Sequence, residues 1–218
     1  MTTARWFRPR SRQPTWRGLL HELMVVPALV ATAWVVTSAA GPVERVALAV
    51  QGLSMTALFA LSATYHRHSP TLKARRINRK LDHSAIFVLI AGSYTPICLL
   101  VLDRPLGLVV LTAVWLVAAH GVRQKSLRLE LEHDRVHSWM YVVLGGTAFL
   151  ILPQLIDGMG LARMLWSAGA GVLYGFGGWV LVKRRVDPWP KSFGFHEVWH
   201  TCVTVAIAIN FGVAATLV

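Results

Sequence analysis

The chain has 218 residues, of which 55% are hydrophobic and only 15% are charged, and its 22 Lys and Arg residues against 10 Asp and Glu residues give a formal net charge of +12. An ordinary soluble domain carries about 25% charged residues, so this composition excludes a soluble globular protein, and it equally excludes a disordered chain. The basic excess leaves nucleic acid, anionic lipid or membrane topology as explanations, and the positions of the charges decide between them.

Seven hydrophobic segments follow one another along the chain, each of about the 20 residues that a helix needs to cross a bilayer. They lie at 19–40, 43–65, 82–102, 106–121, 137–156, 161–182 and 197–218. The sequence therefore predicts an all-α membrane protein with a seven-transmembrane helix bundle. Two regions are expected: a basic N-terminal segment over residues 1–18, and the seven-helix domain over residues 19–218, which leaves no room for a second globular domain.

The cationic residues concentrate in alternate loops. Nineteen of the 22 Lys and Arg residues precede the first segment or lie between segments two and three, four and five, or six and seven, and the other side holds only Arg45, Arg104 and Arg163. Short cytoplasmic loops carry the Lys and Arg excess in membrane proteins. We therefore expect the N-terminus in the cytoplasm and the C-terminus outside. No nucleic-acid-binding motif accompanies the cations, so membrane lipids are the expected partners.

The sharpest candidate for chemistry opens the last segment, where His196 and His200 stand four residues apart. Two histidines at this spacing share one helix face, which suits chelation of a single metal ion. The same five residues satisfy the pattern H-E-x-x-H, in which the Glu, here Glu197, is the general base of a metalloprotease. We predict that both histidines are metal ligands, and the alternative is an interfacial pair beside Trp199.

Segments two and three contribute polar residues at the same predicted membrane depth. Segment two ends with Ser62 and His66, one helical turn apart on one face. A third histidine and a water would complete an open, catalytic-type zinc site, and the alternatives are a snorkelling His66 and a Ser62 hydroxyl bonded to the backbone. Asp82 opens segment three after a run of cations. It is expected to be the N-cap of that helix, or a carboxylate that takes a proton from a metal-bound water, or both.

Other polar or small residues have simpler interpretations. The pair His133 and His137 lies in the most charged stretch of the chain, and we interpret it as part of a solvated linker. His21, at the start of segment one, is interpreted as an ordinary segment-end residue. Gly171 and Gly175 in segment six predict close helix packing, and Asn210 predicts an interhelical hydrogen bond.

Three short motifs, taken together, are the basis of a family resemblance. They are Ser62-x-x-x-His66, Asp82 within Leu-Asp-His-Ser-Ala-Ile-Phe followed by Ala-Gly-Ser-Tyr-Thr-Pro at 91–96, and His196-x-x-x-His200. The chain resembles the hemolysin III family, the bacterial branch of the progestin and adipoQ receptor superfamily, over nearly its whole length. The resemblance implies zinc bound by His66, His196 and His200, with Asp82 contacting the metal-bound water and Ser62 near the site. It also implies the bacterial inner (cytoplasmic) membrane as location, and the charge distribution described above predicts that the site lies near the cytoplasmic face.

The resemblance also frames the functional alternatives. The superfamily is similar to alkaline ceramidases, which implies an intramembrane hydrolase that cleaves a lipid amide or ester, such as a ceramide-like substrate, through a zinc-bound water. Asp82 would then be the general base, and Ser62 would orient the substrate. The alternatives are a receptor-like regulator of membrane lipid or energy homeostasis with a structural zinc, and a pore-forming hemolysin. An H-E-x-x-H protease would instead need Glu197 as its base.

Overall fold

A computed structural model describes residues 13–128 and 135–218. In these ranges the elements are helical, and strand-like pairing is limited to one isolated bridge between Trp189 and Phe193. The helices in chain order are α1 (Leu19–Ser38), α2 (Pro42–Arg67), α3 (Leu72–Leu100), α4 (Arg104–Arg128), α5 (Arg135–Gly146), α6 (Leu152–Met159), α7 (Leu161–Lys183) and α8 (Phe195–Ala215), with the 3₁₀ helix η2 (Thr147–Ile151) between α5 and α6.

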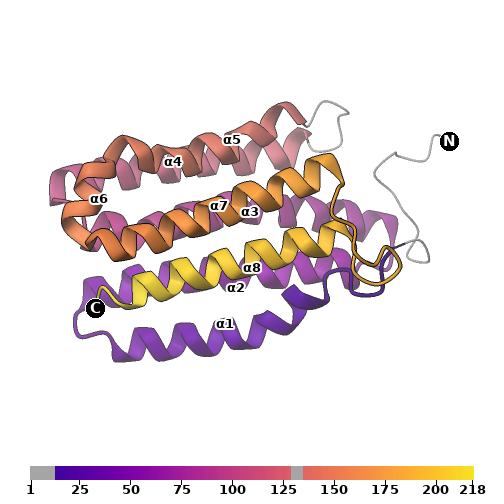
Figure 1. The fold of residues 1–218 in the computed structure, drawn as a ribbon, viewed down its shortest axis with the longest axis horizontal. Helices are drawn as coiled ribbons and strands as arrows, with labels where there is room; N and C mark the ends of the chain where they lie inside the picture. Colours follow the sequence, from indigo (N-terminus) through magenta and orange to yellow (C-terminus); the bar gives the residue numbers. More distant parts are fainter. Residues whose placement is uncertain (1–12, 129–134) are drawn as a thin grey trace.

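Seven stretches of the described chain are long and apolar enough to cross a membrane. Six of them are single helices, and the fifth, Met140–Met159, runs from α5 through η2 into α6. The helices lie alongside one another along one axis, so that α1 begins and α8 ends at opposite ends of the bundle (Figure 1). The predicted seven-transmembrane helix bundle is confirmed.

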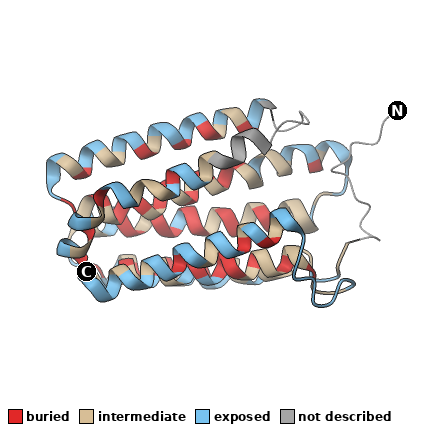
Figure 2. Cartoon of the chain, turned by 45° about the horizontal axis from the view of Figure 1, so that its top comes forward, coloured by how far each residue is buried: buried red, intermediate tan, exposed pale blue. Residues whose placement is uncertain are grey.

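Apolar side chains cover the outside of the bundle as well as its inside. Buried positions lie mainly on helix faces turned toward other helices, and exposed positions face outward (Figure 2). Exposed large apolar residues include Leu29, Trp34, Phe149 and Val182. Soluble proteins rarely expose wide apolar surfaces, so this outer surface is suited to lipid.

Two clusters of buried apolar side chains hold the bundle together, and α3 contributes to both. One cluster joins α1, α2, α3 and α8 around Phe59 and Leu89. The other joins α3 and α4 to the fifth span around Phe87 and Leu144. In addition, α8 packs against α7 and touches α1, α2 and α3. The ends of α2, α3 and α8 are therefore held near one another by the core.

Helix α3 begins at Leu72, ten residues before the predicted start of its hydrophobic segment at 82. Its N-cap is Thr71, whose hydroxyl accepts a hydrogen bond of 3.1 Å from the N–H of Ala74. The expectation that Asp82 is the N-cap is therefore wrong. The reason is that Lys and Arg are good helix formers, so the cationic run before the apolar segment continues the same helix.

The close approach of α7 and α8 occurs at Gly177. A Cβ atom on Gly177 would lie 2.8 Å from Cβ of Cys202 and 2.8 Å from Cε3 of Trp199. The prediction of packing at Gly171 and Gly175 is wrong, because a Cβ atom on either would meet no heavy atom of the described residues within 4 Å. At 100° per residue, Gly171 and Gly175 lie about 120° and 160° around the helix from Gly177, so they face other directions.

The predicted interhelical hydrogen bond of Asn210 joins α8 to α7. Its partner is the hydroxyl group of Tyr174. Such bonds between spanning helices satisfy polar groups that lipid cannot. Together with the contact at Gly177, this bond fixes α7 against α8.

We expect Gly177→Ala to destabilise the protein and Gly175→Ala to leave its stability unchanged or slightly raised. The first substitution forces a methyl group against Cys202 and Trp199, and overpacking of this kind costs about 1–3 kcal/mol. The second meets open space and gains helix propensity. Thermal unfolding of the two variants in the same detergent checks this, and equal melting temperatures would contradict the assignment of the α7–α8 contact.

Candidate metal centre

Three histidines from helices far apart in the chain meet at one end of the bundle. His66 is next to the last residue of α2, and His196 and His200 lie in the first two turns of α8. One ligand nitrogen from each lies within 4.8 Å of the other two, and Nε2 of His66 is 3.2 Å from Nε2 of His196. The structure thus brings together the three residues predicted as ligands, in a group that could hold a metal ion.

One pair of nitrogens in this histidine trio has the spacing of two ligands on a single ion. Two nitrogens bound to one tetrahedral zinc at about 2.0–2.1 Å are about 3.3 Å apart, close to the 3.2 Å between His66 and His196. The three ring planes are inclined to one another by 57°, 62° and 74°, so the rings can approach a common centre from different directions. Imidazole suits zinc, copper, iron and nickel, so the donor set admits zinc without selecting it.

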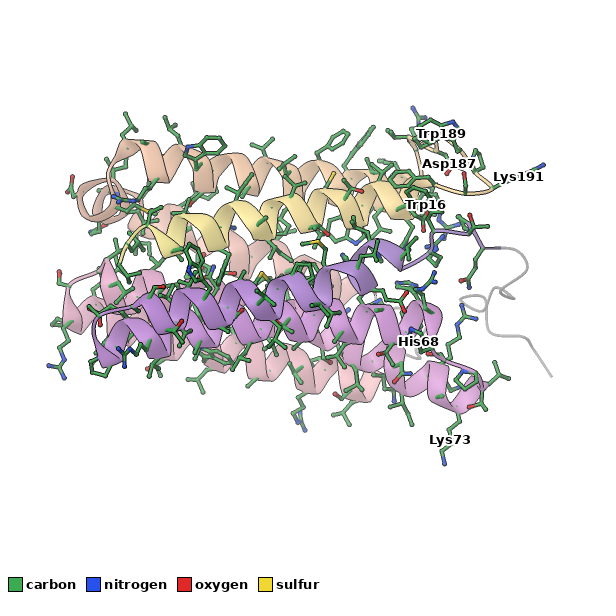
Figure 3. The ribbon with its side chains drawn as sticks, turned by 90° about the horizontal axis from the view of Figure 1, so that it is seen from below. Trp16, His68, Lys73, Asp187, Trp189 and Lys191 are labelled. Carbon is green, nitrogen blue, oxygen red and sulfur yellow. The ribbon has the colours of Figure 1, made fainter. Side chains whose placement is uncertain are left out.

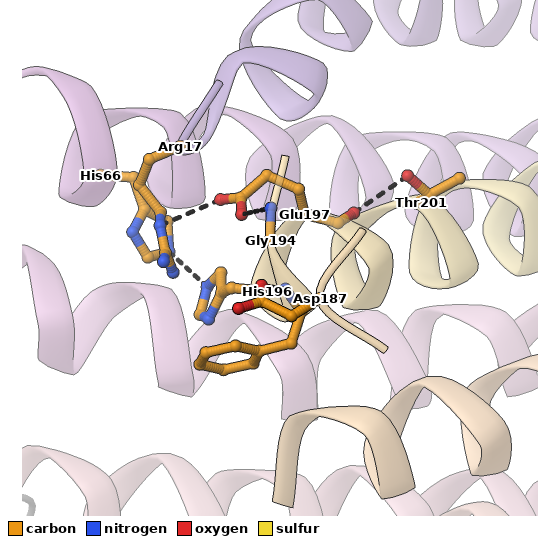
Figure 4. A network of polar contacts seen from close by, with 8 residues as sticks. Arg17, His66, Asp187, Gly194, His196, Glu197 and Thr201 are labelled. Carbon is orange, nitrogen blue, oxygen red and sulfur yellow. Dashed lines mark hydrogen bonds and ion pairs between the residues drawn. The ribbon is translucent and has the colours of Figure 1, made fainter. Parts of the chain in front are cut away.

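Buried contacts of Glu197 fix the first turn of α8. Glu197 is 3% exposed; its Oε2 accepts a hydrogen bond of 2.9 Å from the N–H of Gly194, and its Oε1 lies 3.0 Å from Nε of Arg17 (Figure 4). The first contact satisfies an N–H group that the start of a helix leaves without a partner. Because both carboxylate oxygens are engaged, Glu197 is poorly placed to be the general base of an H-E-x-x-H protease.

The segment before α1 lies against the connection between α7 and α8, near the histidine trio. The N–H groups of Thr15 and Trp16 donate hydrogen bonds of 3.1 Å to the carbonyl oxygens of Lys191 and Ser192. The Trp16 ring meets Phe193 edge-on with 5.9 Å between ring centroids. Trp16 and Lys191 lie at the same end of the bundle (Figure 3). This pairing holds the start of α1 close to the start of α8.

Gly18, the residue just before α1, lies close to His66 of α2. Gly18 has φ of +75°, a conformation that residues with a Cβ atom rarely adopt. A Cβ atom there would also lie only 2.6 Å from Cβ of His66. Glycine is therefore required at this position both by the backbone and by the space beside His66.

Ser62 and Asp82 lie beside the trio. Ser62 is 2% exposed and one turn before His66 on α2, and its hydroxyl group donates a hydrogen bond to the Asp82 carboxylate. Asp82 interacts electrostatically with His66, and its Oδ2 lies 3.5 Å from Nδ1 of His83. The residues predicted to accompany the ligands are thus close to them, with the carboxylate held by a neighbouring hydroxyl.

One histidine of this end of the bundle was missed by sequence reasoning. His21 on α1 is 3% exposed, and its ring stacks on that of His200 with 4.0 Å between centroids and 3° between planes. The available signal was its position at the same predicted membrane depth as the trio. An isolated histidine at a segment end gives no indication of which helix it faces, so the signal was weak.

The remaining histidines take no part in the trio. His68 pairs at the surface with Glu22, with 2.6 Å between Nε2 and Oε1, and His120 contacts Gln124 four residues later. His133 lies outside the described residues, as does the side chain of His137. Among the residues that the structure describes, the trio is the one group of three or more potential ligands close enough to hold an ion.

Comparison with known proteins extends these observations. Residues 10–211 match the family model described as Haemolysin-III related. Hemolysin-3 of Bacillus cereus is 32% identical over 168 residues, covering 76% of this chain and 72% of that protein. Hemolysin-3 homolog of Bacillus subtilis (strain 168) is 29% identical over 189 residues, covering 87% and 85%. Monocyte to macrophage differentiation factor of Homo sapiens is 24% identical over 198 residues, covering 88% and 78%.

We expect His66→Ala to abolish stoichiometric metal binding, because it removes one of the three nitrogens that converge. His68→Ala is the matched control, since His68 lies two residues away and pairs with Glu22 at the surface. Asp82→Asn should also retain the metal, because Asp82 is not one of the grouped ligands. Elemental analysis of the three purified variants after zinc loading checks this. Full metal content in His66→Ala would contradict the assignment of the ligands.

Proposed function

This chain is a multi-pass membrane protein that belongs to the haemolysin-III-related family, and we propose that it is an intramembrane zinc hydrolase of lipid amides or esters. The observation that carries the proposal is the histidine trio with Ser62 and Asp82 beside it. Structural zinc sites are closed by four protein ligands, whereas catalytic sites have three and keep one position open. The group found among the described residues has three members, which favours the catalytic type.

The proposed chemistry divides between the metal and two side chains. When bound, zinc would activate a water at neutral pH, and it would also polarise the substrate carbonyl group. Asp82 is the general base, which accepts a proton at its carboxylate and delivers it to the leaving amine or alcohol. Ser62 holds that carboxylate through its hydrogen bond and helps to orient the substrate.

The surroundings of the site favour a lipid substrate. The trio lies where α2 ends and α8 begins, and both helices are long and apolar enough to cross a membrane. The amide or ester bond of a membrane lipid lies near the interface, level with the ends of spanning helices, and its acyl chains lie deeper in the hydrocarbon. A ceramide-like molecule has this arrangement, with an amide bond at the interface.

We further propose that the metal centre faces the cytoplasm from the bacterial inner membrane. The support is the distribution of charge, with 19 of 22 Lys and Arg residues in the N-terminal segment and the alternate connections. The trio lies at the end of the bundle where α1 and α8 begin. By the positive-inside rule this end is cytoplasmic.

This orientation predicts opposite results for two reporter fusions. Alkaline phosphatase fused after Val218 should be active, because the end of α8 is then outside the cytoplasm. The same enzyme fused after Asp187, in the basic connection between α7 and α8, should be inactive, and a fluorescent protein fused there should be bright. The reverse pattern of activities in whole cells would contradict a cytoplasmic metal centre.

Two other functions remain as alternatives, and each is suggested by the name of a relative. Hemolysin-3 of Bacillus cereus suggests lysis of target membranes, and Monocyte to macrophage differentiation factor suggests a regulator without catalytic activity. A regulator would use the metal structurally and would not need the Asp82 carboxylate. A cytolysin would lyse cells without needing the metal.

The decisive prediction concerns Asp82→Asn. We expect the zinc-loaded variant to keep its metal and its thermal stability but to lose turnover by about 10²–10⁴-fold, the usual contribution of a general base. Asp103→Asn is the matched control, because Asp103 is an exposed carboxylate beyond the other end of α3. Release of fatty acid from a panel of ceramides, N-acyl amines and acyl esters provides the measurement.

The opposing outcomes identify the alternatives. If the zinc-loaded wild type releases no fatty acid from any member of the panel, the hydrolase proposal is contradicted. Full biological activity of Asp82→Asn would then point to a regulator. Lysis of red cells by purified protein, with His66→Ala equally lytic, would point to a cytolysin.

A further inference from the structure

His21 lies outside the ligand group but in contact with one of its members. Its ring is parallel to that of His200 within 3°, at 4.0 Å between centroids. It is 3% exposed, and Phe59 of α2 packs against it with 5.2 Å between centroids. A buried flat ring stacked on a candidate ligand is in a position to fix the orientation of that ligand.

The ring geometry excludes His21 as a ligand of the same ion. A metal ion bound by His200 lies in the plane of the His200 ring, along the lone pair of the nitrogen. The His21 ring is parallel to that plane and displaced from it, so the nitrogens of His21 point past the ion rather than toward it. The three grouped rings are instead inclined to one another by at least 57°.

If His200 binds a metal through Nε2, it lacks the contact that usually orients a metal-binding histidine. Such residues normally donate a hydrogen bond from the second ring nitrogen to a carboxylate or carbonyl group, which fixes the plane of the ring. Nδ1 of His200 is buried and has no hydrogen-bond partner among the described residues. The plane of this ring must therefore be fixed by packing.

We propose that His21 is a positioning residue of the metal centre, which holds the plane of the His200 ring by stacking against its face. The inference rests on the proposed metal centre and adds α1 to it. The Arg17–Glu197 contact, 3.0 Å long, fixes the entry of α1 against the first turn of α8, and the stack follows four residues later. A ring face also suits a metal-bound imidazole, whose electron density is withdrawn by the ion, because aromatic faces attract positive charge.

Cobalt titration of purified protein in detergent tests this role without any assay of turnover. His21→Ala should raise the Kd for Co²⁺ by about 10–100-fold, the usual effect of losing a residue that orients a ligand, and should change the ligand-field absorption bands. His21→Phe restores a flat face and should bind Co²⁺ nearly as wild type does. Val35→Ala is the control, since Val35 is a buried residue of α1 at 5% exposure, and it should lower thermal stability without changing the Kd.

Three results would overturn the inference: an unchanged Kd in His21→Ala, equal weakening in His21→Phe and His21→Ala, or equal weakening in Val35→Ala. In each of them the wild type binds Co²⁺, so the metal centre itself stands. Failure of the wild type to bind Co²⁺ would overturn the metal centre, and the role of His21 with it.

Discussion

The ion pair between Arg17 and Glu197 joins the start of α1 to the start of α8, and the histidine trio depends on this arrangement. Glu197 lies between the two ligands of α8, and Arg17 lies just before α1. Removing one partner of a buried pair leaves an uncompensated charge and costs about 3–5 kcal/mol, so this contact strongly restricts how α1 and α8 can sit relative to each other. The hydrogen bonds of Thr15 and Trp16 reinforce the same restriction.

The polar groups at this end of the bundle form a connected set rather than isolated residues. Glu197 closes the start of its helix, the Ser62 hydroxyl contacts the Asp82 carboxylate, and His21 lies face to face with His200. Ionisable residues in membrane-spanning segments are unfavourable unless they pair with one another or face a polar cavity. Their mutual contacts explain how an apolar bundle tolerates so many of them at one level.

The sequence predicted the spans well and their details less well, for identifiable reasons. The hydrophobic runs determine where a helix crosses a bilayer, so all seven spans were located. Hydrophobicity does not determine where a helix starts, and the basic residues after Leu72 extend α3 so that Asp82 lies inside it. A glycine such as Gly177 packs closely only if its side of the helix lies against a neighbouring helix. Which side of each helix does so is determined only when the bundle assembles. The same limit hid His21, whereas His196 and His200 were predicted from their spacing and His66 from the resemblance carried by the Ser62-x-x-x-His66 motif.

The separation of the ligands along the chain has a consequence for the synthesis and membrane insertion of the protein. His66 and His196 are 130 residues apart, and four candidate spans lie between the spans that contain them. A nascent chain therefore has a single ligand until its last helix emerges from the ribosome. Metal capture would then mark the completion of insertion, and unfinished chains would lack this means of holding α2 and α8 together.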